Sequence, residues 1–176
     1  MSWTTDRKVI NEAIAATIEQ INDWFKNELY RSDLKIQLVN ATNAKSISRR
    51  FTLTGGVRQV DWDWEAIYFR KVKLKPAWMF ELVQKGRTGA LCYGQVNVRG
   101  SYTTIEYLER KVSFKKLKGL AAQTAFQFAA TVAKTLDLKE VRLMDPHPAL
   151  VLYYQKTLGL TRHPAQGVVQ YLARRL

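Results

Sequence analysis

The sequence has one cysteine, few acidic residues and no long apolar run, and each shortage excludes a class of protein. The lone Cys92 cannot form an internal disulfide or supply a cysteine cage for structural zinc. No stretch approaches the roughly 18 uncharged apolar residues that a membrane-spanning helix needs. Residues 1–29 mix acidic residues into their apolar positions, unlike a secretory signal. We therefore expect a cytoplasmic protein with no membrane partner and no bound metal.

The shortage of acidic residues leaves a strongly basic chain. The chain has only 15 aspartates and glutamates but 28 lysines and arginines, so its formal net charge is +13. Such an imbalance speeds encounters with polyanions, and the two basic clusters, at residues 45–75 and 110–118, are either solvated faces or surfaces for nucleic acid or a phosphate-rich cofactor. The residues that we expect to contact nucleic acid, with tRNA or another RNA favoured over DNA, are Arg49, Arg50, Arg70, Lys71 and Lys73.

The length and the apolar content fit a single domain. A chain of 176 residues is tight for two domains, and an apolar fraction of 47% is enough for an ordinary core. Apolar residues recur at helical spacing from Val9 to Leu29, behind a cap at Thr4 or Thr5. We expect one domain over residues 1–176 that begins with an amphipathic helix. This helix packs on a sheet or on a partner, and a homodimer is compatible with the second arrangement.

The next third of the chain has a mixed pattern. Alternation predicts a strand at Lys35–Val39, and a second strand at Ser48–Leu53 after an asparagine-rich turn. The segment Asp61–Lys75 fits neither a helical nor a strand period. Its structure is therefore left to tertiary context.

The pattern becomes clear after Pro76. Two apolar runs, Ala77–Val83 and Ala90–Val98, are joined by a short turn that contains glycine, and they predict a β-hairpin. The run Thr103–Leu108 follows another glycine turn and predicts a third strand beside the second. We therefore expect a three-stranded antiparallel meander.

Helices and strands alternate in the remainder of the chain. A basic loop with a glycine, Phe114–Ala121, leads into an amphipathic helix that ends near Asp137. The later elements are expected to be a strand at Val141–Met144, a helix at Leu150–Leu158 that Gly159 terminates, and a last strand at Gly167–Leu172.

Two motifs in this region resemble the C-terminal part of the GNAT N-acyltransferase family. The family's pyrophosphate loop, Gln/Arg-x-x-Gly-x-Gly/Ala, is matched by Lys116-Leu-Lys-Gly119-Leu-Ala121, with lysine in the first position. Its later segment, Asn-x-x-Ala followed by Tyr and Gly-Phe, is matched by Asp145-Pro-His-Pro-Ala149, Tyr153-Tyr154 and Gly159-Leu160. The resemblance covers residues 77–172. It implies an α/β (α+β) fold with a central, mostly antiparallel sheet flanked by helices, to which this chain adds its N-terminal helix.

The resemblance also implies acetyl-CoA as cofactor. A glycine lets the backbone approach a pyrophosphate, and amides at a helix start point toward it with the favourable end of the helix dipole. The lysines of this loop add positive charge at the same place. The residues expected to bind acetyl-CoA are Leu108, Lys116, Leu117, Lys118, Gly119, Leu120 and Ala121.

The family uses a tyrosine to protonate the leaving thiolate of CoA, and this chain offers two. Counting back from Gly159 favours Tyr154, whereas counting on from Ala149 favours Tyr153, and we choose Tyr154. Adjacent residues on a helix cannot share a face, so one of the pair is expected to pack against the core.

The general base is a choice between carboxylates and histidines. Glu106 and Glu109 lie on or beside the third strand of the meander, and regular alternation places them on opposite faces. We name Glu109 as the candidate, and each glutamate is otherwise a surface residue. His147 and His163 are the other candidates, with an ordinary loop role as the alternative.

The sequence therefore predicts an N-acyltransferase that moves an acetyl group from acetyl-CoA to an amine. The basic clusters suggest an acceptor on aminoacyl-tRNA, or on a ribosomal or nucleic-acid-associated protein. The alternative is a weakly active or inactive GNAT-like module that binds nucleic acid or a protein partner through its basic surface.

Overall fold

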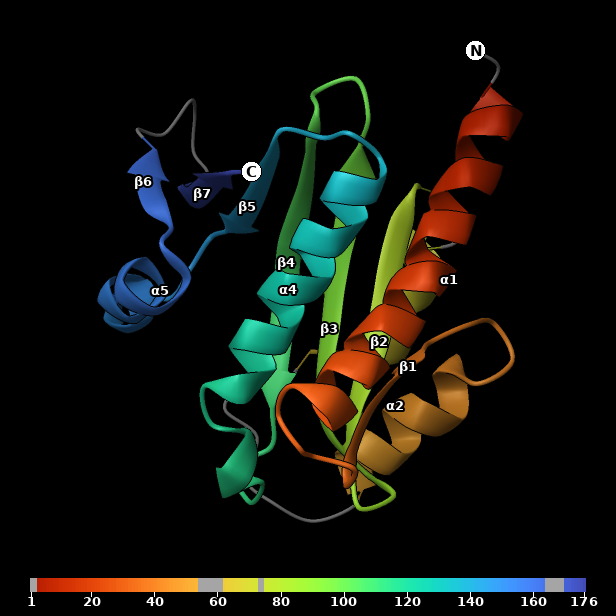
Figure 1. Ribbon diagram of the computed structural model, residues 1–176. Coiled ribbons are helices and arrows are strands. Elements are labelled where there is room, and N and C mark those ends of the chain that lie inside the picture. Colours follow the sequence, from red (N-terminus) through yellow and green to blue (C-terminus); the bar gives the residue numbers. More distant parts are fainter. Residues whose placement is uncertain (1–2, 54–61, 73–74, 164–169) are drawn as a thin grey trace.

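The computed structural model describes residues 3–53, 62–72, 75–163 and 170–176, which contain a seven-stranded sheet (Figure 1). The strands lie in the order β1-β2-β3-β4-β5-β7-β6, and every neighbouring pair is antiparallel except β4 and β5. The predicted class, a mostly antiparallel sheet flanked by helices, is confirmed. The strands are β1 Leu34–Leu38, β2 Ala77–Gln84, β3 Arg87–Asn97, β4 Tyr102–Arg110, β5 Glu140–Met144, β6 Thr161–His163 and β7 Tyr171–Arg175.

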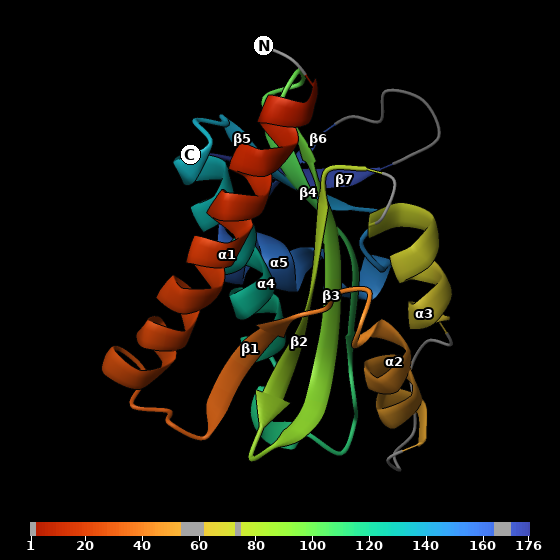
Figure 2. The ribbon, with the colours of Figure 1, turned by 90° about the vertical axis from the view of Figure 1, so that its right-hand side faces the viewer.

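Helices cover both faces of the sheet. Helices α1 and α4 lie together on one face, and α2 and α3 lie on the other, as Figure 2 shows from the side. The helices are α1 Trp3–Asn27, α2 Ala44–Leu53, α3 Trp64–Ile67, α4 Leu120–Thr135 and α5 Val151–Leu158. Three short turns are the π-helical η1 Tyr68–Val72 and the 3₁₀ turns η2 Lys115–Leu117 and η3 Pro148–Leu150.

Each face of the sheet has its own hydrophobic core. The larger core joins α1 and α4 to side chains such as Phe80 and Cys92, and the predicted N-terminal amphipathic helix is confirmed within it. The smaller core joins α2 and the segment 64–68 to side chains such as Met79 and Leu91. Because successive residues of a strand alternate between faces, β2 and β3 contribute to both cores. These central strands are therefore buried over most of their length.

Most predicted elements of the second half are confirmed, and the largest error lies in the first half. The strand predicted at Ser48–Leu53 is wrong, because these residues form the last turns of helix α2, which buries Ile47 and Phe51 four residues apart. The ambiguous segment is mostly helical, as α3 and η1. The last strand begins at Tyr171, later than predicted. The predicted start, Gly167, lies outside the described residues. The short strand β6 was not predicted.

Gly94 in β3 is a site where a side chain would strain the fold. A β-carbon there would lie 2.0 Å from the Thr104 carbonyl oxygen and 2.2 Å from the Trp78 ring. Because the backbone cannot move aside cheaply, we expect Gly94→Ala to lower the free energy of unfolding by about 3 kcal/mol. Gly86→Ala is the control, since its β-carbon meets nothing within 4 Å and only its φ of +74° opposes the change. Urea unfolding of both variants measures the difference, and equal losses would contradict the expected clash.

Candidate functional site

A cleft opens where β4 and β5 part. The two strands pair only from Tyr102↔Glu140 to Ile105↔Leu143, although β4 continues to Arg110. Beyond this point β5 ends, and the chain turns away into the proline-containing segment before α5. The resulting cleft has a volume of about 690 Å³, and half of β4 forms one wall while residues 143–150 form the other.

A bulge in β4 lies at the point where the strands part. Tyr93 of β3 pairs with Tyr107 and Gly94 pairs with Ile105, so Glu106 is an extra residue in β4. Bulges bend a strand and re-aim its side chains. Glu106 and Glu109 consequently both contact the segment 62–72 and both line the cleft. The expectation that they point to opposite faces is therefore wrong.

The two glutamates have different surroundings. Glu109 is 2% exposed, and its Oε2 accepts a hydrogen bond of 2.7 Å from the indole nitrogen of Trp64. The Glu106 side chain is 19% exposed and lies 3.4 Å from the ammonium group of Lys71. Glu106 is thus the more accessible of the two glutamates.

Lys71 fills the space beside Glu106. Its Nζ also donates a hydrogen bond of 2.9 Å to the hydroxyl of Tyr107. Burial alone would lower the pKa of Lys71, but the hydrogen bond to Tyr107 and the charge of Glu106 together raise this pKa above its ordinary value. The side chain is therefore a paired cation at the edge of the cleft.

The two tyrosines of α5 have separate contacts. Tyr154 lines the cleft and packs against the larger core, and burial raises the pKa of its phenol. Tyr153 instead donates a hydrogen bond of 3.3 Å to the carbonyl of Gly119. Tyr154 is thus the phenol that faces the cleft, while Tyr153 holds the loop before α4.

The start of α4 presents free backbone amides. Gly119 precedes the helix with a φ of +80°, and no side chain in the described parts of the chain caps it. The first amides of a helix have no intrahelical acceptor, so those of residues 120–122 are free to bind an anion. The side chains of Leu117 and Ala121 are buried, whereas Lys116 and Lys118 are exposed. The loop thus offers an anion backbone amides and lysine side chains.

Leu108 and Arg110 connect this loop to the cleft. Leu108 lies on the cleft wall, beyond the last pair of β4 with β5. The guanidinium of Arg110 donates hydrogen bonds to the carbonyls of Lys111 and Phe114, at 2.7 and 3.1 Å. This role of Arg110 was not predicted, because nothing in the local pattern distinguishes Arg110 from the other cations of its cluster.

The histidines have other partners. Nδ1 of His147 accepts a hydrogen bond of 3.3 Å from the amide of Ala149. His147 also lines the cleft. His163 stacks on the ring of Tyr171 in the adjacent strand.

The described residues that were predicted to bind nucleic acid lie on two segments, α2 and η1. Arg49 and Arg50 are exposed on α2, and Arg50 lies 3.8 Å from the buried Glu81. Arg70 is exposed on η1, whereas Lys71 forms an ion pair with Glu106 at the edge of the cleft. Lys73 lies outside the described residues.

Within the described ranges, three or more histidine, cysteine, aspartate or glutamate side chains nowhere gather as a metal would require. Of the helices described, none is both long and apolar enough to cross a membrane.

Comparison with known proteins identifies the fold. The sequence matches no family model and no curated protein. A probable GNAT-family acetyltransferase from Chromobacterium violaceum has a similar structure, with a TM-score of 0.60 at 12% identity over 82% of this chain and 88% of that one. The ribosomal-protein-S18-alanine N-acetyltransferase from Escherichia coli gives 0.58 at 15% identity, over 81% and 93% of the two chains.

A third solved structure carries a ligand. It is a putative acetyltransferase from Salmonella typhimurium with its cofactor acetyl-CoA, and it gives a TM-score of 0.52 at 12% identity over 82% of this chain and 95% of that one. The chain therefore has the GNAT fold, as the sequence motifs predicted.

Proposed function

We propose that this GNAT-fold chain is an N-acetyltransferase that uses acetyl-CoA and an amine acceptor. One observation carries the proposal: the cleft between β4 and β5 has the uncapped start of α4 beside one end and the phenol of Tyr154 on its wall. The fold likeness to an acetyltransferase solved with acetyl-CoA supports this reading. Acetyl-CoA, when bound, supplies an acyl thioester.

The amides around Gly119 fit the pyrophosphate of such a ligand. They combine free N–H groups, a glycine at positive φ and the exposed lysines 116 and 118. These are the features by which a helix start binds phosphate. The edge of β4 around Leu108 is without a β5 partner, so it can hydrogen-bond the amide groups of an extended chain.

Tyr154 is proposed to hold the proton that the leaving sulfur needs. A tyrosine with a raised pKa stays neutral throughout the physiological range, so its Oη carries a proton to donate. Tyr153 is proposed as a positioning residue, because its hydroxyl is bonded to the loop at Gly119.

Glu106 is proposed to accept the proton from the acceptor amine. Glu109, which the sequence analysis favoured, is almost completely buried and already accepts the Trp64 N–H, so a substrate has little access to it. Glu106 lines the same cleft and is more exposed. It can therefore take a proton from a bound amine, either directly or through a water molecule. Lys71 is the ion-pair partner of Glu106 that an acceptor amine would have to replace.

We expect Glu106→Gln to lower kcat about tenfold while leaving the Kd for acetyl-CoA unchanged, because the amide keeps the shape but cannot take a proton. Glu109→Gln is the matched control, and it should keep kcat within about threefold while lowering the melting temperature, because it changes a buried group. Release of free thiol from acetyl-CoA measures turnover. A larger loss of kcat in Glu109→Gln would return the role of base to Glu109.

The acceptor is proposed to be an amine on aminoacyl-tRNA, or on a ribosomal or nucleic-acid-associated protein. The net charge of +13 supports an acceptor that a polyanion presents. The Lys71–Glu106 pair makes this edge of the cleft less anionic, which disfavours a small polycation. Thiol release with aminoacyl-tRNA, basic peptides and a polyamine, each at equal concentration, would rank these acceptors.

The competing function is a GNAT-like binding module without turnover. The contact of Glu106 with Lys71 favours it, because the lysine ammonium group occupies the carboxylate that an acceptor amine would need. The thiol assay decides between the two, since the module predicts no release with any acceptor although acetyl-CoA binds.

A further inference from the structure

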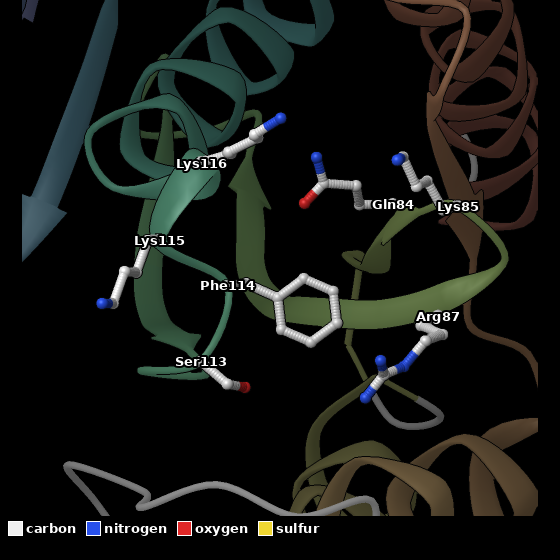
Figure 3. A pocket seen from close by; sticks show the side chains of 7 residues that line it. All are labelled: Gln84, Lys85, Arg87, Ser113, Phe114, Lys115 and Lys116. Carbon is white, nitrogen blue, oxygen red and sulfur yellow. The ribbon is translucent and has the colours of Figure 1, made fainter.

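Two pockets adjoin at the β2–β3 turn. One has a volume of about 420 Å³, and its lining includes Lys85, Arg87 and Phe114 (Figure 3). The other has a volume of about 230 Å³, and its lining includes Lys35 and Arg87. Arg87 borders both pockets, and we call the two neighbouring pockets together the hairpin groove.

The groove passes around the end of the hairpin. Phe114 packs against the larger core, on the face that carries α4, whereas Arg50 reaches the smaller pocket from α2 on the opposite face. Figure 3 shows the Phe114 ring between Lys116 on one side and Arg87 on the other, while Lys115 points away. A ligand that fills both pockets must therefore bend around the turn.

The cations of the groove are available. Lys35, Lys85, Arg87 and Lys116 are exposed, and none forms an ion pair with any residue that the structure describes. The acids nearby are already engaged. The buried Glu81 accepts a hydrogen bond from the Thr88 hydroxyl, and Asp33 accepts hydrogen bonds from Arg31 and Gln84.

An aromatic ring lies among these cations. The guanidinium of Arg87 lies 5.5 Å from the centroid of the Phe114 ring. Planar arginine and aromatic groups beside a basic groove are the elements with which proteins bind single-stranded nucleic acid, since the cations follow the phosphates and the flat groups stack on bases. A duplex is stiff over about 150 base pairs, so it cannot bend around one hairpin, whereas a single strand can.

We propose that the hairpin groove binds single-stranded RNA. The phosphates contact Lys35, Lys85, Arg87 and Lys116, and a base stacks beside Phe114. This site is not the one that the sequence suggested. Of the arginines predicted to contact nucleic acid, only Arg50 borders the groove. The groove shares Lys116 with the proposed acetyl-CoA loop but does not include the cleft, so RNA binding here does not require acetyl transfer, although it would suit an acceptor that RNA presents.

The test is fluorescence anisotropy with a labelled 12-nucleotide oligouridine. Wild-type affinity should fall about 50-fold between 50 and 200 mM salt, as four phosphate contacts on a single strand predict. The double variant Lys35→Glu/Arg87→Glu should bind about 20-fold more weakly at low salt and show roughly half the salt slope. Thermal melting verifies that the variant is folded.

The control makes the same charge change at the other end of the sheet. Lys139→Glu/Arg175→Glu alters two exposed cations beside the β3–β4 turn and should weaken binding by no more than about threefold. Equal weakening by both variants would mean that only net charge matters, and would overturn the proposal. So would the absence of binding at low salt or a preference for the duplex.

Discussion

Tyr154→Phe is expected to lower kcat about 100-fold while leaving the Kd for acetyl-CoA unchanged, because it removes the proton donor and keeps the ring. The expectation follows from the position of this phenol on the cleft wall and from its raised pKa. Thiol release at saturating acceptor measures kcat, and calorimetry measures Kd.

Tyr153→Phe is the matched control on the adjacent residue. Its hydroxyl holds the Gly119 carbonyl, so its loss should weaken acetyl-CoA binding about threefold and leave kcat nearly unchanged. The opposite pattern, an inactive Tyr153→Phe and a fully active Tyr154→Phe, would show that the neighbouring tyrosine is the acid.

Gly119→Glu is expected to weaken acetyl-CoA binding about 100-fold, which corresponds to about 2.7 kcal/mol. A β-carbon at this position would lie 3.0 Å from the Tyr153 hydroxyl, and the φ of +80° is one that side chains rarely adopt. The new carboxylate would also repel the pyrophosphate at the start of α4. Calorimetry with acetyl-CoA measures the loss.

Gly86→Glu is the control that separates the loss of acetyl-CoA binding from backbone strain. Gly86 has a similar φ of +74°, but open space surrounds its β-carbon position, and it lies on the β2–β3 turn. Both variants should lose similar stability, and only Gly119→Glu should lose affinity. If Gly119→Glu is folded and binds acetyl-CoA normally, the pyrophosphate lies elsewhere.

Local pattern was enough to predict the meander and the loop-to-helix transition at Gly119. Apolar runs bounded by glycine turns define β2 and β3, and the short connections leave few alternatives to antiparallel pairing. Helix α2 was missed because Phe51 and Leu53 alternate like a strand. The better signal was the helical spacing of Ala44, Ile47 and Phe51, the residues that α2 buries.

The candidate site depends more on contacts between distant segments. The bulge at Glu106 arises from the pairing of β3 with β4, and the residue pattern of β4 alone does not predict it. Likewise, the contacts of Lys71 with Glu106 and of Trp64 with Glu109 join segments 35 and 45 residues apart. The choice between Tyr153 and Tyr154 also depends on tertiary structure, since only the fold shows which of the two contacts Gly119.

Calorimetric titration of the wild-type protein with acetyl-CoA tests the central claim most directly. The cleft and the α4 start together predict one site per chain with a Kd below about 100 μM. The affinity should fall with rising salt, since phosphate groups meet lysines at this loop. No heat of binding at millimolar acetyl-CoA, from protein that melts cooperatively, would contradict the proposal that this cleft holds acetyl-CoA.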